Sequence, residues 1–371
     1  MFNQAIAQYL STFQGSLFPN YNNNQEVRTD KHYEVMLALD VIDLNKFFFY
    51  DSCNRVGRPQ KDRCAIAKSF VAKTVLNLPT TVALHDRLKS DITLRRICGF
   101  ETSCKVPCLA TLSNAFAEFS KANLLTYVHE TMIKELYKET IVIDLSRDAT
   151  AIPAREKPAK KEKLKGVFKE EIVPRKQGRP RLGEIVPEKE KSRIEKQMTM
   201  SLGEMTKELP KNCDYGTKKN SNGNKETWKG YKLHLDADNG SIPLNFIVTS
   251  ASVHDSQVAI PLELSTNQRL NSCYRLMDAA YASEFIKEYI EAQGKVAIID
   301  PKKPKGGEKI PLDPAKKIRY KIRTTVERTN AALKDDFGAK YLRVRGYEKV
   351  VTHLGFGIIA MVALRSIKLI F

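Results

Sequence analysis

The stretch Ile141-Val142-Ile143-Asp144-Leu145 divides the chain into two kinds of sequence. It is short and rich in β-branched residues, a composition that favours a β-strand. Before it, apolar side chains recur at helical spacing, as in the set Cys64, Ile66, Phe70, Val71, Val75 and Leu76. After it, strand-like and helix-like segments alternate. The sequence therefore predicts a helical part followed by an α/β part.

The predicted helical part spans residues 36–138, after about 35 polar residues that we expect to be poorly structured. Its helices are expected near Lys61–Leu76, Val82–Leu88, Ile92–Cys98, Thr111–Ala117 and Leu124–Tyr137. Helices joined by tight turns commonly enter the major groove of DNA. This small, basic all-α domain is therefore either a DNA-binding domain or a scaffold that only braces its neighbour.

The predicted α/β part spans residues 139–371. A hairpin is expected at Asp238-Asn239-Gly240, because Asn-Gly between two apolar runs is a strong turn signal. Further strands are expected at Cys273–Met277 and Val296–Ile299, a helix after Ser283, and a long helix over Lys316–Lys334. This order predicts a mixed sheet, antiparallel first and parallel later.

Two other segments differ in composition from the rest. Residues 155–225 are Lys-rich and poor in apolar side chains, so we expect an extended insertion or a mobile loop. Within it, Gly178-Arg179-Pro180-Arg181 resembles an AT-hook, in which Arg179 and Arg181 would enter a narrow minor groove; a merely charged linker is the alternative. The apolar C-terminal run contains Arg365 and Lys368, so we expect a buried helix rather than a membrane span.

The charge balance indicates a polyanionic partner. Lys and Arg number 61 against 43 Asp and Glu, giving a formal net charge of +18. Such a surplus costs self-repulsion, which nucleic acid would offset. Seven cysteines, an odd count without a CxxC pair, indicate reduced thiols and a cytoplasmic protein with no membrane partner.

Three acidic residues far apart in the chain are candidates for one metal site. Phosphodiester cleavage develops negative charge on two oxygens, and two divalent ions about 3.5–4 Å apart can stabilise both. Asp148 and Asp278 each follow a predicted strand, where α/β sheets place ligands, and Glu327 lies in the long helix. Asp144 is the rival for the first position, because it faces the same side of its strand as Asp148.

The long helix carries four functional side chains on one face. Tyr320, Arg323, Glu327 and Lys334 fall within an arc of roughly 60° at 3.6 residues per turn. Ile322, Val326 and Leu333 form a different face that can pack on the sheet. Taken alone, an exposed helix with an Arg323–Glu327 ion pair worth a few tenths of a kcal/mol is the simpler interpretation.

This Tyr-x2-Arg-x3-Glu-x6-Lys pattern resembles that of a large group of bacterial insertion-sequence transposases. These are DDE enzymes with an RNase H-like catalytic core, related in fold to retroviral integrases. Asp148-Ala149-Thr150 resembles the first-Asp motif of the group, and Met277-Asp278-Ala279 resembles the second. The Ala-Thr that follows Asp148 favours it over Asp144 as the first ligand. The resemblance covers nearly the whole chain.

The resemblance implies a set of roles. Asp148, Asp278 and Glu327 would bind two Mg²⁺ ions, for which Mn²⁺ can substitute, while Arg323 and Lys334 would hold phosphates and Tyr320 would contact terminal nucleotides. The double-stranded DNA would be the terminal inverted repeats and the target, held by a homodimer at the bacterial nucleoid. The enzyme would cleave at the element ends and transfer the 3′-hydroxyl strand.

Some features leave the reaction route open. Some relatives carry a large β-rich insertion between the second Asp and the Glu, but only 48 residues separate Asp278 from Glu327 here. The resemblance therefore does not carry over the hairpin step by which members of the group release an end. A catalytically inactive, transposase-derived DNA-binding protein and an RNase H-like nuclease are the alternative functions.

Three further side chains have more than one interpretation. Trp228, the single tryptophan, could stack on a DNA base or pack at the start of the hairpin. His254 and Asp255 invite an acid–base role, but we interpret them as structural or as a turn cap, since two-metal chemistry needs no such base.

Overall fold

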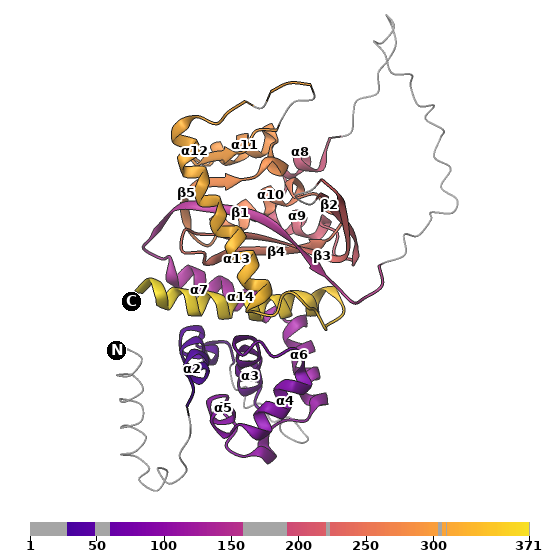
Figure 1. The fold of residues 1–371 in the computed structure, drawn as a ribbon, viewed down its shortest axis with the longest axis vertical. Coiled ribbons are helices and arrows are strands. Elements are labelled where there is room, and N and C mark those ends of the chain that lie inside the picture. Colours follow the sequence, from indigo (N-terminus) through magenta and orange to yellow (C-terminus); the bar gives the residue numbers. More distant parts are fainter. Residues whose placement is uncertain are drawn as a thin grey trace, which may run out of the picture.

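A helical layer and a mixed sheet lie on opposite sides of the C-terminal helix α14 (Tyr347–Ile370) in the computed structural model (Figure 1). The structure describes residues 28–48, 60–158, 191–219, 223–302, 306–308 and 310–370. The fold class agrees with the prediction: a mixed α/β sheet, consistent with an RNase H-like catalytic domain, follows a helical part.

The helical part contains every helix that the periodicity predicts. Its elements are α2 (Asp30–Ile42), η2 (Leu44–Phe47), α3 (Arg63–Val75), α4 (Thr81–Ser90), α5 (Ile92–Ile97), η3 (Ser103–Lys105), α6 (Leu109–Lys121) and α7 (Leu124–Leu136). Side-chain caps fix three of their starts, because Asp62, Thr80 and Asp91 each accept a hydrogen bond from a first-turn amide.

The first described helix begins earlier in the chain than predicted. Helix α2 begins at Asp30, inside the segment that we expected to be poorly structured. It buries Val35, Ala38, Leu39 and Ile42, an apolar face that the polar residues around it obscure. His32 adds a contact to α5, with its Nε2 2.9 Å from Asp91 Oδ2. Burial and this pair account for the early start.

One six-stranded sheet forms the centre of the α/β part. Its strands are β1 (Ile141–Pro153), β2 (Asp214–Lys219), β3 (Lys225–Ala237), β4 (Pro243–Ser250), β5 (Asn271–Met277) and β6 (Val296–Ile299). The order is β2-β3-β1-β5-β6, with β4 also paired to β3. The pairs of β3 with β1, β2 and β4 are antiparallel, and β1–β5 and β5–β6 are parallel, as predicted.

Strand β1 is longer than expected, and this changes the position of Asp148. The parallel ladder with β5 ends at the pair Arg147–Met277, but β1 continues antiparallel to β3 as far as Pro153. Asp148 therefore lies in mid-strand, beside the end of β5, rather than at the end of its own strand. Gly230 allows the close approach of β3 there, because a Cβ at its φ of +152° would lie 2.2 Å from the Ile152 carbonyl oxygen.

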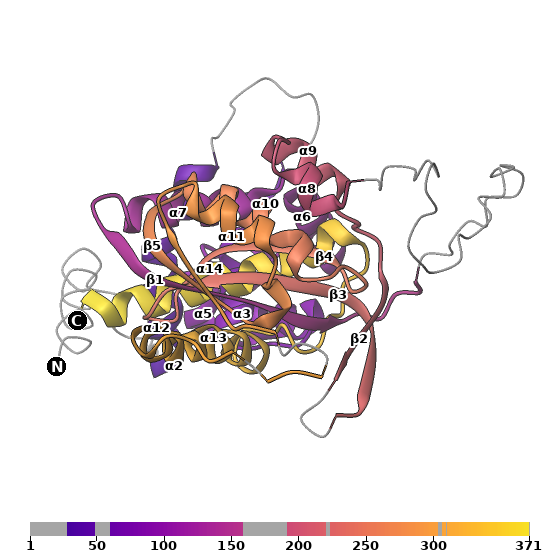
Figure 2. The ribbon, with the colours of Figure 1, turned by 90° about the horizontal axis from the view of Figure 1, so that it is seen from above.

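Helices cover both faces of the sheet (Figure 2). Helices α10 (Ser256–Asn267) and α11 (Glu284–Glu291) pack on one face, together with α8 (Arg193–Gln197) and α9 (Leu202–Glu208). The other face receives α12 (Pro314–Tyr320), the 3₁₀ turn η5 (Lys321–Arg323) and α13 (Thr324–Asp335). The predicted long helix is thus interrupted by one tighter turn at residues 321–323.

Part of the predicted insertion is regular structure. Residues 191–219 contain α8, α9 and β2, and Ser192 and Ser201 each begin a helix with a capping box. Their burial against α10 explains why a segment poor in apolar residues still folds. Residues 159–190, with the AT-hook-like segment, lie outside the described residues.

The C-terminal helix is the centre of the core. By length and composition α14 could cross a membrane, with a mean hydropathy of 1.8 over Tyr347–Lys368, yet 72% of that window is buried inside the protein. It contacts α2, α3, α6 and α7 on one side and β4 and α13 on the other. Phe356 packs on Phe70 and Phe116, with ring centroids 5.5 and 6.1 Å apart. The run is a core helix, as predicted.

Candidate active site beside the end of strand β5

Two of the predicted acidic residues lie side by side across the parallel strands. Since Arg147 pairs with Met277, Asp148 and Asp278 are the next residues along β1 and β5. Met277 is the last residue of β5, and Asp278 then caps a 3₁₀ turn (η4, Ala279–Tyr281) by accepting a hydrogen bond of 3.0 Å from the Ala280 amide. The two carboxylates therefore lie side by side where the parallel pairing of β1 and β5 ends, the position at which parallel strands place ligands.

The third acidic residue is joined to this pair by an arginine. Arg323 Nη2 lies 3.0 Å from Glu327 Oε1, and its Nη1 lies 3.9 Å from Asp148 Oδ1. The Tyr320 hydroxyl accepts a hydrogen bond of 3.1 Å from Arg323 Nε, which fixes the guanidinium. The side chains of Tyr320, Arg323 and Glu327 thus share one helix face, as the spacing predicts, while Val326 and Leu333 are buried.

The electrostatics of the site indicate an excess of buried negative charge. Burial raises the pKa of Asp148 to about 6; Arg323 opposes this shift, and Asp278 adds to it. Burial also raises the pKa of Asp278, with smaller opposing effects from the Ala280 amide and Arg323. Both carboxylates would be more easily ionised with a further cation nearby.

The donor set suits a hard divalent cation, which prefers carboxylate oxygens. Asn330 donates a hydrogen bond of 3.1 Å to Asp148 Oδ2, and its own Oδ1 is buried without a donor, a position that a metal-bound water would satisfy. Within the described ranges, however, no three His, Cys, Asp or Glu side chains stand close enough to share one ion. Arg323 lies between Asp148 and Glu327, so a bound ion would have to displace this guanidinium.

Asp144, the rival of Asp148, is engaged elsewhere. Its side chain is only 4% exposed, and Oδ1 lies 2.6 Å from Arg319 Nη1. Arg319 stacks on the Tyr274 ring at 3.9 Å, and Asn239 donates to the other carboxylate oxygen at 3.3 Å. As predicted, Asp144 and Asp148 face the same side of β1, but Asp144 serves to attach α12 to the sheet.

A buried ionic network lies behind Asp148, on the opposite face of the sheet. Arg147 donates hydrogen bonds of 2.7 and 2.8 Å to the carboxylate of Asp236 and one of 3.0 Å to Glu263. Arg275 of β5 donates to the same Glu263 at 2.6 and 2.8 Å. All four side chains are 0% exposed. The network joins β1, β3, β5 and α10 directly next to the two carboxylates.

The sequence predicted neither Asn330 nor Asp300 as a site residue, and it predicted only a structural or turn-cap role for Asp255. Asn330 lies one turn after Glu327, and a hydrogen bond to a residue 182 positions earlier leaves no trace in local spacing. Asp255 and Asp300 both raise the pKa of Asp278, and Asp255 also raises that of Asp148. Asp300 directly follows β6, so its position at the carboxyl end of a parallel strand could have been predicted from the sequence.

The remaining predicted residues have varied surroundings. Trp228 donates a hydrogen bond of 3.1 Å to the Tyr231 carbonyl, and its ring covers Gly216 of β2, so packing accounts for it and a DNA contact stays a prediction. His254 bonds Ser256 at the start of α10, in keeping with a turn role. Lys334 lies on α13, where burial and Lys218 lower its pKa. Arg179 and Arg181 lie outside the described residues.

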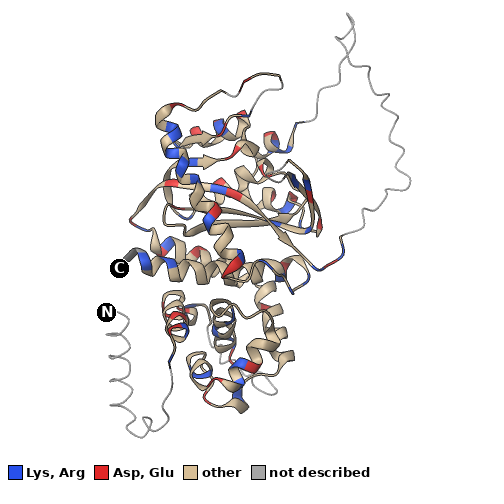
Figure 3. Ribbon diagram, viewed as in Figure 1, with Lys and Arg blue, Asp and Glu red and all other residues tan. Residues whose placement is uncertain are grey.

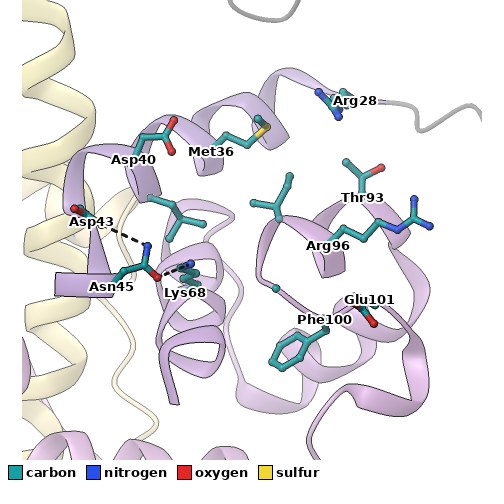
Figure 4. A pocket seen from close by; sticks show the side chains of 13 residues that line it. Arg28, Met36, Asp40, Asp43, Asn45, Lys68, Thr93, Arg96, Phe100 and Glu101 are labelled. Carbon is teal, nitrogen blue, oxygen red and sulfur yellow. Dashed lines mark hydrogen bonds between the residues drawn. The ribbon is translucent and has the colours of Figure 1, made fainter. Parts of the chain in front are cut away.

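A cavity in the helical part is separate from this site (Figure 4). It encloses about 540 Å³ between α2, α3 and α5. Asp40 and Asp43 stand at one side of it and Arg28 and Arg96 at the other, while Asn45 bonds Lys68 at 3.1 Å. None of the predicted site residues lines it.

Models of known protein families match both parts of the chain. Residues 148–363 match the family model described as Transposase DDE domain, which is more than half of the chain. The chain belongs to the insertion-sequence DDE transposases. Residues 23–118 match a second model, Transposase domain (DUF772), which covers most of the helical part. No curated protein is similar enough to count as a match.

Membership in the DDE transposases carries a general activity. The domain is that of a DNA-cleaving transposase, DNA is its substrate, and the family normally uses divalent metal ions. The matched region begins at Asp148 and contains Asp278 and Glu327. It ends within α14, so the family domain includes the helix on which the helical part packs.

Proposed function

We propose that this transposase binds the terminal inverted repeats of its element, cleaves at the ends and transfers the 3′-hydroxyl strand to target DNA. The observation that carries the proposal is the adjacency of Asp148 and Asp278 at the end of the parallel ladder, with Glu327 joined to them through Arg323. These are the acidic groups that a two-metal phosphodiester reaction requires.

Asp148 and Asp278 would hold the first Mg²⁺ ion, and Glu327 would join once Arg323 releases its carboxylate. Two such ions, for which Mn²⁺ can substitute, would activate the attacking oxygen and stabilise the leaving one. Two ions about 3.5–4 Å apart, each about 2 Å from its ligands, span roughly 8 Å between carboxylates. In the free protein Arg323 occupies this space, 3.9 Å from the Asp148 carboxylate and 3.0 Å from that of Glu327.

Arg323 would then have a second use. A guanidinium is planar, permanently charged and suited to bidentate contacts with phosphate. Its Nη1 is buried without a hydrogen bond, so a phosphate oxygen would supply the missing acceptor. We infer that Arg323 neutralises the carboxylates in the free protein and turns to the DNA phosphate when the ions bind. Tyr320 would keep it within reach of both.

An end-cleavage assay tests the proposal. Labelled duplexes carrying the DNA that borders the gene are incubated with the protein and Mg²⁺, and nicks at the element end are mapped. Asp148→Asn, Asp278→Asn and Glu327→Gln should each abolish cleavage while the duplex is still bound. Asp144→Asn is the matched control, because it removes a carboxylate from the same strand face and should leave cleavage in place.

The outcomes separate the alternative functions. Binding without any cleavage by the unaltered protein would identify a DNA-binding protein that has lost catalysis. Cleavage without preference for the repeats would indicate an RNase H-like nuclease. Light scattering of the protein bound to two end duplexes should give the mass of a homodimer, the assembly in which two ends are paired.

A further inference from the structure

Two neighbouring cavities form a continuous basic groove between the helical part and the α13–α14 connection. They enclose about 340 and 350 Å³ and share Lys73, Thr74, Pro79 and His353 as lining residues. Lys73 and Thr74 belong to α3 and His353 to α14, so neither part forms the groove alone. We call this surface the junction groove.

The junction groove is strongly unbalanced in charge. Its single acidic lining residue is Asp335, which lies 3.6 Å from Lys340. Its cationic lining residues are Lys73, Lys334, Lys340, Arg343, Arg345 and Lys349. Six cations against one carboxylate favour an anionic ligand that extends over the whole groove.

Most of these cations have no partner inside the protein. Among the described residues, Arg343, Arg345 and Lys349 are exposed and none of them makes an ion pair or a side-chain hydrogen bond. Lys73 is half-buried, and burial lowers its pKa to about 8 without help from any carboxylate. A charge in such a place costs free energy unless an anion compensates it.

The groove wall is held in place by a neutral histidine. Burial and Lys73 lower the pKa of His353 to about 4, so its Nε2 donates a hydrogen bond of 3.0 Å to the Gly338 carbonyl at neutral pH. Asn77 adds a second link, since its amide donates to the Asp335 carbonyl at 2.8 Å. The connection that carries the cations is therefore fixed both to the turn after α3 and to α14.

Helix α13 connects the junction groove with the acidic site. Lys334 lines the groove and follows Glu327 by seven residues on α13, a distance of roughly 10 Å at 1.5 Å per residue. Asp148 also acts electrostatically on Lys334. At 3.4 Å of rise per base pair, roughly 10 Å corresponds to about three base pairs of duplex.

We propose that the junction groove binds the sugar–phosphate backbone of duplex DNA, with Lys334 about three base pairs from the phosphate that is cut. The inference deepens the proposed function and rests on it, because the transposon end would have to pass through both the groove and the acidic site. Arg343, Arg345 and Lys349 would contact successive phosphates at the rim, and Lys73 would meet one deeper in. The contacts would set register, not sequence preference.

The salt dependence of binding tests the groove. Affinity for a fluorescein-labelled 30-base-pair duplex is measured by anisotropy between 50 and 200 mM salt, without divalent ions, for the full chain and for the triple variant Arg343→Ala, Arg345→Ala, Lys349→Ala. Each lost phosphate contact lowers the slope of log affinity against log salt by about 0.9. We expect a slope smaller by about 2.7, so the unaltered protein loses about 40-fold more affinity over that range.

A matched control removes the same charge elsewhere. Lys196, Lys207 and Lys287 are exposed lysines on α8, α9 and α11, on the sheet face opposite α13, and their triple alanine variant should keep the slope of the unaltered protein. Thermal melting should be the same for both triple variants, because every substituted side chain is exposed. Equal slopes for the two triple variants would overturn the proposal.

Failure of the groove proposal can be distinguished from failure of the proposed function. If the unaltered protein cleaves element ends but the groove variant keeps its slope, the groove proposal fails and the function stands. If the groove variant loses slope while the unaltered protein never cleaves, the groove binds DNA and the catalytic proposal fails. An unchanged slope combined with a changed oligomeric mass would assign the groove to a protein partner and also overturn the proposal.

Discussion

Replacing Asp148 by Asn should stabilise the free protein while it removes catalysis. The carboxylate lies in a poorly solvated place beside Asp278, with a side chain 21% exposed. Asn has nearly the same shape, and its carbonyl oxygen can still accept the hydrogen bond that Asn330 donates. The substitution therefore deletes the charge and leaves the packing in place.

The size of the effect follows from the pKa of Asp148. Burial raises it from 3.8 to about 6 in the folded protein, and at about 1.4 kcal/mol per pKa unit this makes the charged form cost about 3 kcal/mol at most. Below pH 4 the group is protonated in both states and contributes nothing. As the pH rises from about 4 to about 6, ionisation of Asp148 lowers the free energy of unfolding of the unaltered protein. Above pH 6 the full cost of the charge remains.

Urea unfolding at pH 4 to 8 in EDTA measures this cost, with the fluorescence of Trp228, the single tryptophan, as the probe. The free energy of unfolding of Asp148→Asn should exceed that of the unaltered protein by about 2–3 kcal/mol above pH 7 and match it near pH 4. Added Mg²⁺ should stabilise the unaltered protein and not the variant, because only the former holds the ion.

The control substitution should act in the opposite direction. Asp144→Asn breaks a nearly buried pair with Arg319 and should lower stability. If Asp148→Asn were less stable than the unaltered protein at pH 7, or if the difference did not change with pH, the charge would not be the source of the cost. The interpretation of Asp148 as a carboxylate whose charge is disfavoured by burial in the free protein would then be wrong.

Three further substitutions test the framework around the site. Arg275→Met leaves Glu263 without its closest partner in a fully buried network, so urea unfolding should show a loss of about 3–5 kcal/mol. Gly230→Ala should lower the melting temperature by several degrees, because the new Cβ would lie 2.2 Å from the Ile152 carbonyl oxygen at a φ of +152°. Lys73→Met should be more stable than the unaltered protein at pH 7, and the gain should shrink as the pH rises from about 8 toward 10.5, where the lysine is neutral in both states.

Local periodicity was sufficient to predict most elements. The helices of the helical part, the hairpin at Asp238–Gly240 and the strands leading to Asp278 depend on spacing and turn chemistry within about fifteen residues. The same-face placement of Tyr320, Arg323 and Glu327 follows from helix geometry alone, and the Arg323–Glu327 contact is the ion pair that this spacing predicts.

Non-local contacts account for what the sequence did not predict. The length of β1 is set by pairing with two different strands, so Asp148 lies in mid-strand although local composition suggests an end. Helices α8 and α9 fold because α10 covers them. The placement of Arg323 between two carboxylates also depends on how α13 lies on the sheet, which no spacing rule contains.

The position of α14 has a consequence for synthesis of the protein. N-terminal segments leave the ribosome first and usually fold as they emerge. Here α2, α3, α6 and α7 close around the last 24 residues of regular structure, so these four helices cannot complete their packing until translation is nearly over. A copy of the gene with an early stop codon would yield neither a working enzyme nor a stable helical fragment able to compete for its DNA.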